Sequence, residues 1–216
     1  MLQRIAAVVF VGAFLAAQTA PPERKVEGSV LISERDPAVR VQLPQAVQYV
    51  GADRWVLYGM ADCELHAFVE ADPHKNVERL YWVQFEGYLP SRPELHHTYD
   101  SPEHATIGGL DFYVDSWARA TAARTQAGSD FEHILALVRA KGFHVPQSMM
   151  YLRLVHLLDE QKRKELMIIY AEDLGPAGFA PADLQPGGKD RARWPAIADA
   201  LLERAKKRIE IKPAGS

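Results

Sequence analysis

The sequence predicts an α+β fold: an antiparallel sheet built from two hairpins plus additional strands and packed by two amphipathic helices. Two pairs of long β-type runs each flank a short polar loop, and only two segments carry apolar residues at the helical period. Strands joined by short loops pair antiparallel, and a few helices can cover one face of such a sheet. A β-barrel or half-barrel packed by the two helices is the alternative that the same pattern allows.

Aromatic, aliphatic and β-branched residues define the two predicted hairpins. The first joins residues 54–70 to residues 77–89 through the turn-prone segment 72–76. The second joins residues 148–158 to residues 165–172, and both of its strands are rich in Leu, Ile, Met and Tyr. Strands that are apolar on both faces lie inside a sheet. The second hairpin is therefore predicted at the centre of the sheet.

Shorter segments complete the predicted sheet. Residues 28–32 and 38–43 are β-type and flank a turn-prone segment, which suits edge strands. Residues 110–117 alternate apolar and polar side chains, as a half-buried strand does. Residues 90–109 contain Pro, His and Gly without a clear period. A loop of that length is uncommon unless it is functional or disordered, so this segment is a second place to look for a site.

Both predicted helices begin at residue types that favour helix N-termini. Ser129, with Glu132 three residues later, has the pattern of a capping box, and Gly142 suits the end of that helix. The second helix starts near Pro195, because proline is favoured in the first turn. Apolar stripes give each helix one packing face: Phe131, Ile134, Leu135 and Val138 in the first, and Ile197, Leu201, Ala205 and Ile209 in the second.

Residues 1–20 have the order of a secretory signal peptide. Arg4 precedes an apolar run over residues 5–17, and small and polar residues follow before Pro21. The run is shorter than the roughly 20 residues that span a bilayer. We therefore expect cleavage between Ala17 and Pro21, a secreted or periplasmic protein, and no stable membrane insertion after cleavage. Residues 21–216 would then form a single α+β domain.

Composition narrows the classes of partner. With 48% hydrophobic and 25% charged residues, the chain is typical of a globular domain. Its formal net charge of −3 gives no electrostatic basis for binding nucleic acid. Cys63 is the only cysteine, which excludes an intrachain disulfide and any site built on several thiolates. We expect Cys63 to be buried and unreactive, and we expect no cofactor.

The first hairpin carries the main candidate site. If Ala71 pairs with Val77, side-chain alternation gathers polar groups and aromatic rings on one face, which suits ligand binding. Glu64 and His66 would point the same way, and Glu86 would lie diagonally across from Glu64, as acid and base groups require. The candidate ligand-binding residues are Tyr58, Asp62, Glu64, His66, Trp82, Gln84, Glu86 and Tyr88.

The long loop carries a weaker, metal-type candidate: His96, His97, Asp100 and His104. Imidazole and carboxylate groups are ligands for divalent transition metals. Adjacent histidines on an extended chain point apart, however, and the spacing matches no established zinc pattern. We therefore expect no stoichiometric structural metal.

Motif inspection leaves two functions open, beside a purely structural role as an envelope protein. The chain contains no Gly-x-Ser-x-Gly, Gly-x-Gly-x-x-Gly, His-Glu-x-x-His or P-loop pattern. The leading hypothesis is an exported binding or interaction domain without catalysis, whose aromatic and acidic hairpin face takes a small ligand or a partner protein. The alternative is an exported hydrolase or lyase that uses Glu64, His66 and Glu86 as acid and base groups, with or without a metal.

Overall fold

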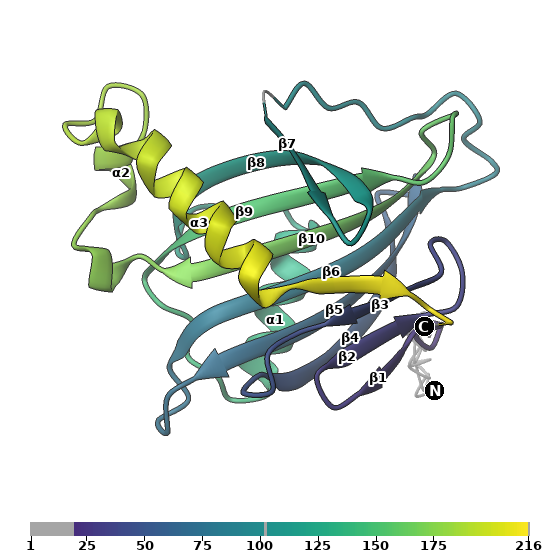
Figure 1. Cartoon of the computed structure of the whole chain (residues 1–216), viewed down its shortest axis with the longest axis horizontal. Coiled ribbons are helices and arrows are strands. Elements are labelled where there is room, and N and C mark those ends of the chain that lie inside the picture. The colour runs from purple at the N-terminus through teal and green to yellow at the C-terminus, as the bar shows by residue number, and fades with distance from the viewer. Residues whose placement is uncertain (1–19, 102, 216) are drawn as a thin grey trace, which may run out of the picture.

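The computed structural model describes residues 20–101 and 103–215 as two antiparallel sheets with three helices around them (Figure 1). The predicted signal peptide lies outside the described residues except for Ala20. Seven strands form the large sheet in the order β4-β5-β6-β10-β9-β8-β7. Their bounds are β4 (Gln48–Leu57), β5 (Ala61–Ala71), β6 (Val77–Tyr88), β7 (Glu103–Ile107), β8 (Leu110–Ala120), β9 (Ser148–Leu157) and β10 (Lys164–Asp173).

The small sheet joins the two ends of the described chain. Its order is β1-β2-β3-β11, and its bounds are β1 (Lys25–Glu27), β2 (Val30–Ser33), β3 (Val39–Gln42) and β11 (Glu210–Pro213). The turn between β7 and β8 lies against β11. At Gly108, φ is +60° and a Cβ would lie 2.2 Å from the carbonyl oxygen of Ile211, so no larger residue fits there. Neither sheet closes on itself, which removes the barrel alternative.

The helices lie on opposite faces of the large sheet. In Figure 1, α3 (Trp194–Arg208) crosses one face and α1 (Asp130–Ala140) lies behind the sheet; α2 (Pro181–Leu184) is a single turn. The α3 face, which also carries the small sheet, holds one core cluster that includes Phe68, Tyr81 and Leu201. The α1 face holds a second cluster, with Trp82 and Ile134. The expectation that helices cover only one face is therefore wrong, because both faces of the central strands are apolar.

The predicted α+β class is confirmed, and so is the place of the second hairpin. β10 is the middle strand of the seven, and β9 is its neighbour. The first hairpin forms, but its first strand begins only at Ala61. Residues 54–57 belong to β4, and a turn with Tyr58 at φ +49° and Gly59 at φ +71° separates the two strands. Three strands were missed in the sequence, namely β1, β11 and β4 as a strand of its own, and β7 lies within the segment predicted as a loop.

A β-bulge changes the predicted register of the first hairpin. Ala71 does pair with Val77, as expected, but Glu70 pairs with Arg79, so Glu78 is an extra residue. Beyond such a bulge every side chain of one strand moves to the other face. Cys63, Leu65 and Ala67 therefore share the α1 face with the even-numbered residues of β6: Leu80, Trp82, Gln84 and Glu86.

Helix α1 begins at the predicted place with a different cap. Ser129 has the extended conformation of an N-cap residue, but its side chain makes no capping hydrogen bond. The Glu132 carboxylate instead accepts a 2.6 Å hydrogen bond from the backbone N–H of Gly128. One of the two hydrogen bonds of the predicted capping box is therefore present, but its donor is Gly128 instead of Ser129. The hydroxyl of Ser129 makes no capping bond.

Across residues 20–101 and 103–215, no helix has both the length and the apolar character that a membrane span requires.

Candidate functional site

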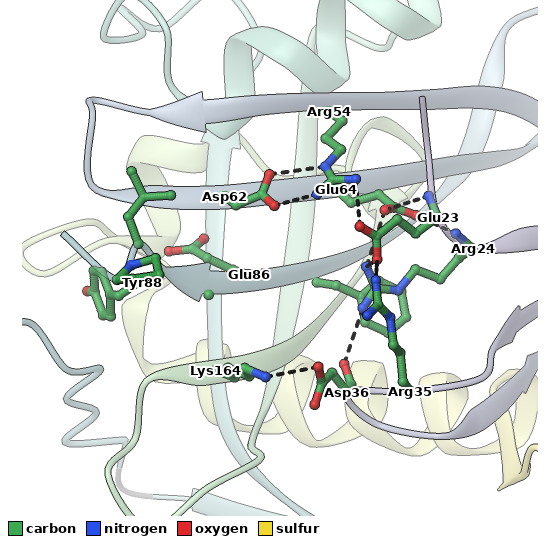
Figure 2. A pocket seen from close by; sticks show the side chains of 14 residues that line it. Glu23, Arg24, Arg35, Asp36, Arg54, Asp62, Glu64, Glu86, Tyr88 and Lys164 are labelled. Carbon is green, nitrogen blue, oxygen red and sulfur yellow. Dashed lines mark hydrogen bonds and ion pairs between the residues drawn. The ribbon is translucent and has the colours of Figure 1, made fainter. Parts of the chain in front are cut away.

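The bulge divides the predicted ligand-binding residues between two faces. Asp62, Glu64 and His66 lie on the α3 side of β5. Trp82, Gln84 and Glu86 lie on the α1 side of β6. The predicted common face is therefore wrong. No hydrogen bond or ion pair among the described residues joins Glu86 to Glu64 or His66, although Glu64 and Glu86 both line the hollow shown in Figure 2, so a catalytic centre that combines the three has little support.

Glu64 and His66 form a closed polar network. His66 Nε2 lies 2.9 Å from Glu64 Oε1, and His66 Nδ1 lies 3.1 Å from the hydroxyl of Tyr49. The Glu64 carboxylate also accepts hydrogen bonds from the backbone N–H groups of Glu23 and Arg24 and from the Arg24 side chain. Burial opposes ionisation of Glu64, but these donors outweigh it and lower its pKa to about 2. Glu64 is thus a fixed carboxylate that secures the N-terminal segment, and it is unsuited to be a general acid.

A hollow of about 310 Å³ lies beside this network (Figure 2). Most of its charged side chains are paired with one another: Arg54 with Asp62 at 2.6 Å, Lys164 with Asp36 at 2.9 Å, and Arg35 with Glu23. Glu86 also lines the hollow and accepts a hydrogen bond from Gln84 rather than pairing with a cation. A polar ligand here would have to break ion pairs that already exist. The arrangement serves to hold the N-terminal segment and the small sheet against β5 and β6.

The α1 face holds a pair of facing carboxyl groups. Glu86 on β6 and Glu165 on β10 are direct cross-strand partners, and Gln84 donates a 3.1 Å hydrogen bond to Glu86. Burial, followed by the charge of Asp130, raises the pKa of Glu86 to about 7. Burial, followed by the charge of Glu86, raises the pKa of Glu165 to about 8. At neutral pH this pair therefore holds at least one proton.

The long loop contributes to the same face. Tyr99 donates a 2.6 Å hydrogen bond to Glu165, and His97 Nδ1 lies 3.0 Å from the same oxygen. The His97 ring also packs 4.5 Å from the ring of Tyr88 and is only 5% exposed. Burial lowers the pKa of His97 to about 4, so its imidazole is neutral at physiological pH.

The predicted metal-type residues of this loop do not form one cluster in the described structure. His97 is buried beside Glu165, whereas His96 and Asp100 are exposed. His104 is exposed on β7, with its ring 4.6 Å from Tyr113. The loop histidines thus have different neighbours, as expected of adjacent residues on an extended chain.

One group of metal-type side chains does come together in the part of the chain described. Ligand atoms of Cys63, Glu86 and Asp130 lie within 4.8 Å of one another. Cys63 is fully buried, as predicted, and burial raises the pKa of its thiol. Burial also raises the pKa of Glu86 and Asp130. These shifts favour protonated groups that hydrogen-bond to one another, whereas a metal ion needs the deprotonated forms.

A cleft of about 350 Å³ opens between the start of α1, residues 119–126 and the middle of the large sheet. Its floor is made by Trp82, Met167 and Ile169, all at most 6% exposed. Aromatic, charged and neutral polar side chains form the walls and rim: Trp117, Arg119, Arg124, Thr125, Gln126, Ser129, Asp130, Phe131 and Arg153. The volume suits a ligand of one or two rings.

Polar groups without partners gather at this cleft. Among the described residues, seven buried side-chain nitrogen and oxygen atoms have no hydrogen-bond partner. Three of them belong to cleft residues: Ser129 Oγ, Asp130 Oδ1 and Arg153 Nε. Leaving such an atom unpaired costs about 1–3 kcal/mol. Neighbouring atoms cover these three atoms, so a bound molecule would satisfy them only after a small shift of the cleft wall.

Tyr58 stands apart from the other predicted ligand-binding residues. It lies in the turn between β4 and β5, and its side chain is 44% exposed. Its ring approaches Gly128, just before α1, since a Cβ on that glycine would lie 3.7 Å from it. Of the eight predicted residues, Trp82 lines the cleft, while Gln84 holds the indole N–H of Trp82 at 2.9 Å.

Sequence reasoning missed most of the cleft. Asp130 stands at the start of the predicted helix and Arg153 interrupts an apolar strand, and both were assigned to those elements with no further role. A charged residue inside a strand predicted to be central was the available signal, because buried charges are rare unless paired. Arg153 meets that description.

Comparison of the chain with protein-family models, with curated proteins and with solved structures finds no match.

Proposed function

We propose that this protein is an exported binding domain that holds a small organic molecule in the cleft beside α1. The observation that carries the proposal is the set of three unpartnered buried polar atoms at the cleft, on Ser129, Asp130 and Arg153. Binding sites of this kind combine an apolar floor with a few polar groups that fix orientation. The hollow in Figure 2 lacks that property, since most of its charged side chains are paired with one another.

The aromatic side chains around the cleft support the proposal. Trp117 stacks on Tyr151 at 5.4 Å with an interplanar angle of 10°, and Phe131 meets the edge of the same tyrosine at 5.8 Å. Arg119 covers Phe131 at 4.0 Å and hydrogen-bonds to carbonyl groups of residues 123 and 124. These contacts hold the walls in place before a ligand arrives, which reduces the entropic cost of binding.

A catalytic role is the second candidate, carried by the facing pair Glu86 and Glu165. Two carboxyl groups with pKa values near neutrality are suited to proton transfer. However, Glu165 is only 3% exposed and is held by Tyr99 and His97, so no substrate reaches it in this conformation. The binding function is therefore the better supported of the two.

A matched pair of tryptophan substitutions tests the binding function. Gln126→Trp places a large ring at the rim of the cleft, and Gln161→Trp makes the same change in the exposed β9–β10 loop. A library of small organic compounds is screened by thermal shift against the unaltered protein. Hits should lose at least about tenfold in affinity with Gln126→Trp, a change of roughly 1.4 kcal/mol, and bind Gln161→Trp normally. Equal binding by both variants would refute the proposed site.

Export is tested separately. The order of residues 1–20 supports cleavage of a signal peptide, and mass spectrometry of the protein from its native host should find a new N-terminus between Ala17 and Pro21. Intact Met1 on a cytoplasmic protein would contradict export and leave the binding proposal standing.

A further inference from the structure

We infer that the ligand of the α1 cleft is a small planar organic anion, such as an aromatic carboxylate. This inference rests on the proposed function and adds the chemical class of the ligand. It follows from the balance of charge in the cleft lining, which contains three arginines, Arg119, Arg124 and Arg153, and one acidic residue, Asp130. The remaining wall and floor residues are aromatic, aliphatic or neutral polar.

Arg153 is the cation best placed to meet an anion. Its guanidinium donates a 2.7 Å hydrogen bond to Asp115 and lies 5.1 Å from the ring centroid of Tyr99, so its position is fixed. Its Nε is buried and has no partner. The side chain as a whole is 32% exposed, so after a small shift of the cleft wall this guanidinium could donate to a carboxylate at little further cost in side-chain freedom.

Asp115, which is ion-paired with Arg153 at 2.7 Å, and Asp130 at the cleft itself offset the charge of the three arginines only in part. Burial is the main factor that raises the pKa of Asp130, and its Oδ1 has no partner. A carboxyl group with a raised pKa takes a proton more readily when an anion approaches, and it then becomes a donor. Asp130 is thus compatible with an anionic ligand, which a fixed carboxylate such as Glu64 would repel.

The start of α1 adds to the same preference. α1 has 11 residues, and its first-turn N–H groups carry the partial positive charge of a helix N-terminus. Ser129, the N-cap residue, lines the cleft, and its hydroxyl makes no capping bond and is buried without a partner. That hydroxyl is an unused donor beside the positive end of the helix, where Asp130 and Glu132 already place two acidic side chains in the first turn.

The rings select the shape of the ligand. Trp82 lies on the floor, and Trp117 and Phe131 lie on the walls. Flat apolar surfaces of this kind favour a flat ligand, because stacked aromatic groups gain roughly 0.5–1.5 kcal/mol beyond the area they bury. A volume of about 350 Å³ limits the ligand to one or two rings.

Three probes of one shape and different charge test the inference: 2-naphthoate, 2-naphthamide and 2-naphthylmethylamine. Isothermal titration calorimetry with the full chain should show that naphthoate binds at least about tenfold more tightly than the amide, and the amine should bind most weakly. The preference for naphthoate should decrease as salt concentration rises.

Charge-matched variants assign the effect to the cleft. Arg153→Gln and Arg124→Gln remove cleft cations, and Arg139→Gln removes an exposed cation in the last turn of α1. Naphthoate affinity should fall about fivefold or more with Arg153→Gln and less with Arg124→Gln, while Arg139→Gln leaves it unchanged. If Arg153→Gln fails to fold, Arg124→Gln still tests whether cleft cations bind naphthoate. Arg124 is exposed at the rim, so its replacement should not affect folding.

The outcomes separate the two claims. Binding of the amide or amine as tightly as naphthoate, with loss in Gln126→Trp, overturns the anionic class and keeps the cleft as a binding site. Naphthoate binding that neither arginine variant weakens also overturns the inference. If none of the three probes binds at millimolar concentration, the inference and the cleft proposal both fail for ligands of this size.

Discussion

At the scale of single residues, the position of each carboxyl group decides its role. Glu64 and Glu86 belong to neighbouring strands, yet the pKa of one is lowered to about 2 and that of the other is raised to about 7. Glu64 has donors on several sides, whereas Glu86 is buried near Asp130 and faces Glu165. Sequence alone identified both residues as candidates but could not distinguish them, because the donors to Glu64 come from segments 40 residues away.

Replacement of Glu64 should destabilise the protein. Glu64→Gln removes a charge that His66, Arg24 and two backbone N–H groups stabilise, so unfolding at pH 6 should become easier by roughly 2–3 kcal/mol. The folded pKa lies below the unfolded one, so this stabilisation is present above about pH 4.5 and is lost as pH falls toward 2. The difference in free energy of unfolding between Glu64→Gln and the unaltered protein should therefore disappear near pH 2.

Urea unfolding at pH 6 and at pH 2–3 measures the effect of Glu64→Gln. Asp62→Asn is the matched control, because it removes the same charge from a side chain that is 42% exposed and paired with Arg54. The control should cost less than about 1 kcal/mol, as exposed ion pairs do. Equal effects of the two substitutions would mean that the buried network does not stabilise the fold.

At the scale of elements, one bulge accounts for the main error in the predicted site. Hydrophobic alternation identified β5, β6, β9 and β10, because each is long and apolar. The extra residue Glu78 shifts β6 by one position, and nothing in local composition marks it. The short strands β1, β7 and β11 were missed for a related reason: each has only three to five residues and depends on pairing with distant segments.

Helix α1 offers a test of the observed cap. Ser129→Ala should not destabilise the protein and should raise the free energy of unfolding by up to about 1–3 kcal/mol, because the hydroxyl makes no capping bond and is buried without a partner. Glu132→Ala should cost about 1 kcal/mol, because it removes the acceptor for the Gly128 N–H. Chemical denaturation of both variants checks this. A loss of stability in Ser129→Ala would restore the capping box that the sequence predicts.

At the scale of the whole molecule, stability should depend on pH on both sides of a maximum. The folded pKa values of Glu86 and Glu165 lie above the usual value, so their contribution is fully present below about pH 4.5 and is lost as pH rises toward 8. Together with the lowered pKa of Glu64, these raised pKa values place the maximum of the free energy of unfolding near pH 4–5. Glu165→Gln keeps an acceptor for Tyr99 and should stabilise the protein at pH 8, by on the order of 2 kcal/mol.

Thermal or urea unfolding between pH 3 and pH 9 measures how stability falls on the acid and alkaline sides of this maximum. Glu165→Gln should reduce the loss of stability above pH 5 and leave stability at pH 4.5 nearly unchanged. Glu103→Gln, a change on strand β7 away from the buried pair, is the control and should leave the profile as it is. An unaltered loss of stability above pH 5 in Glu165→Gln would show that the facing carboxyl groups are not held in their protonated forms.

The central claim is that the cleft beside α1 is the binding site, and a map of backbone amide chemical shifts tests it most directly. The unaltered protein is titrated with naphthoate, and the shifted amides are assigned. We predict that they gather around Trp82 on β6, Ile169 on β10, Arg153 on β9 and the first turn of α1. Shifts that gather instead around Arg54, Asp62 and Glu64, in the hollow of Figure 2, would contradict the account.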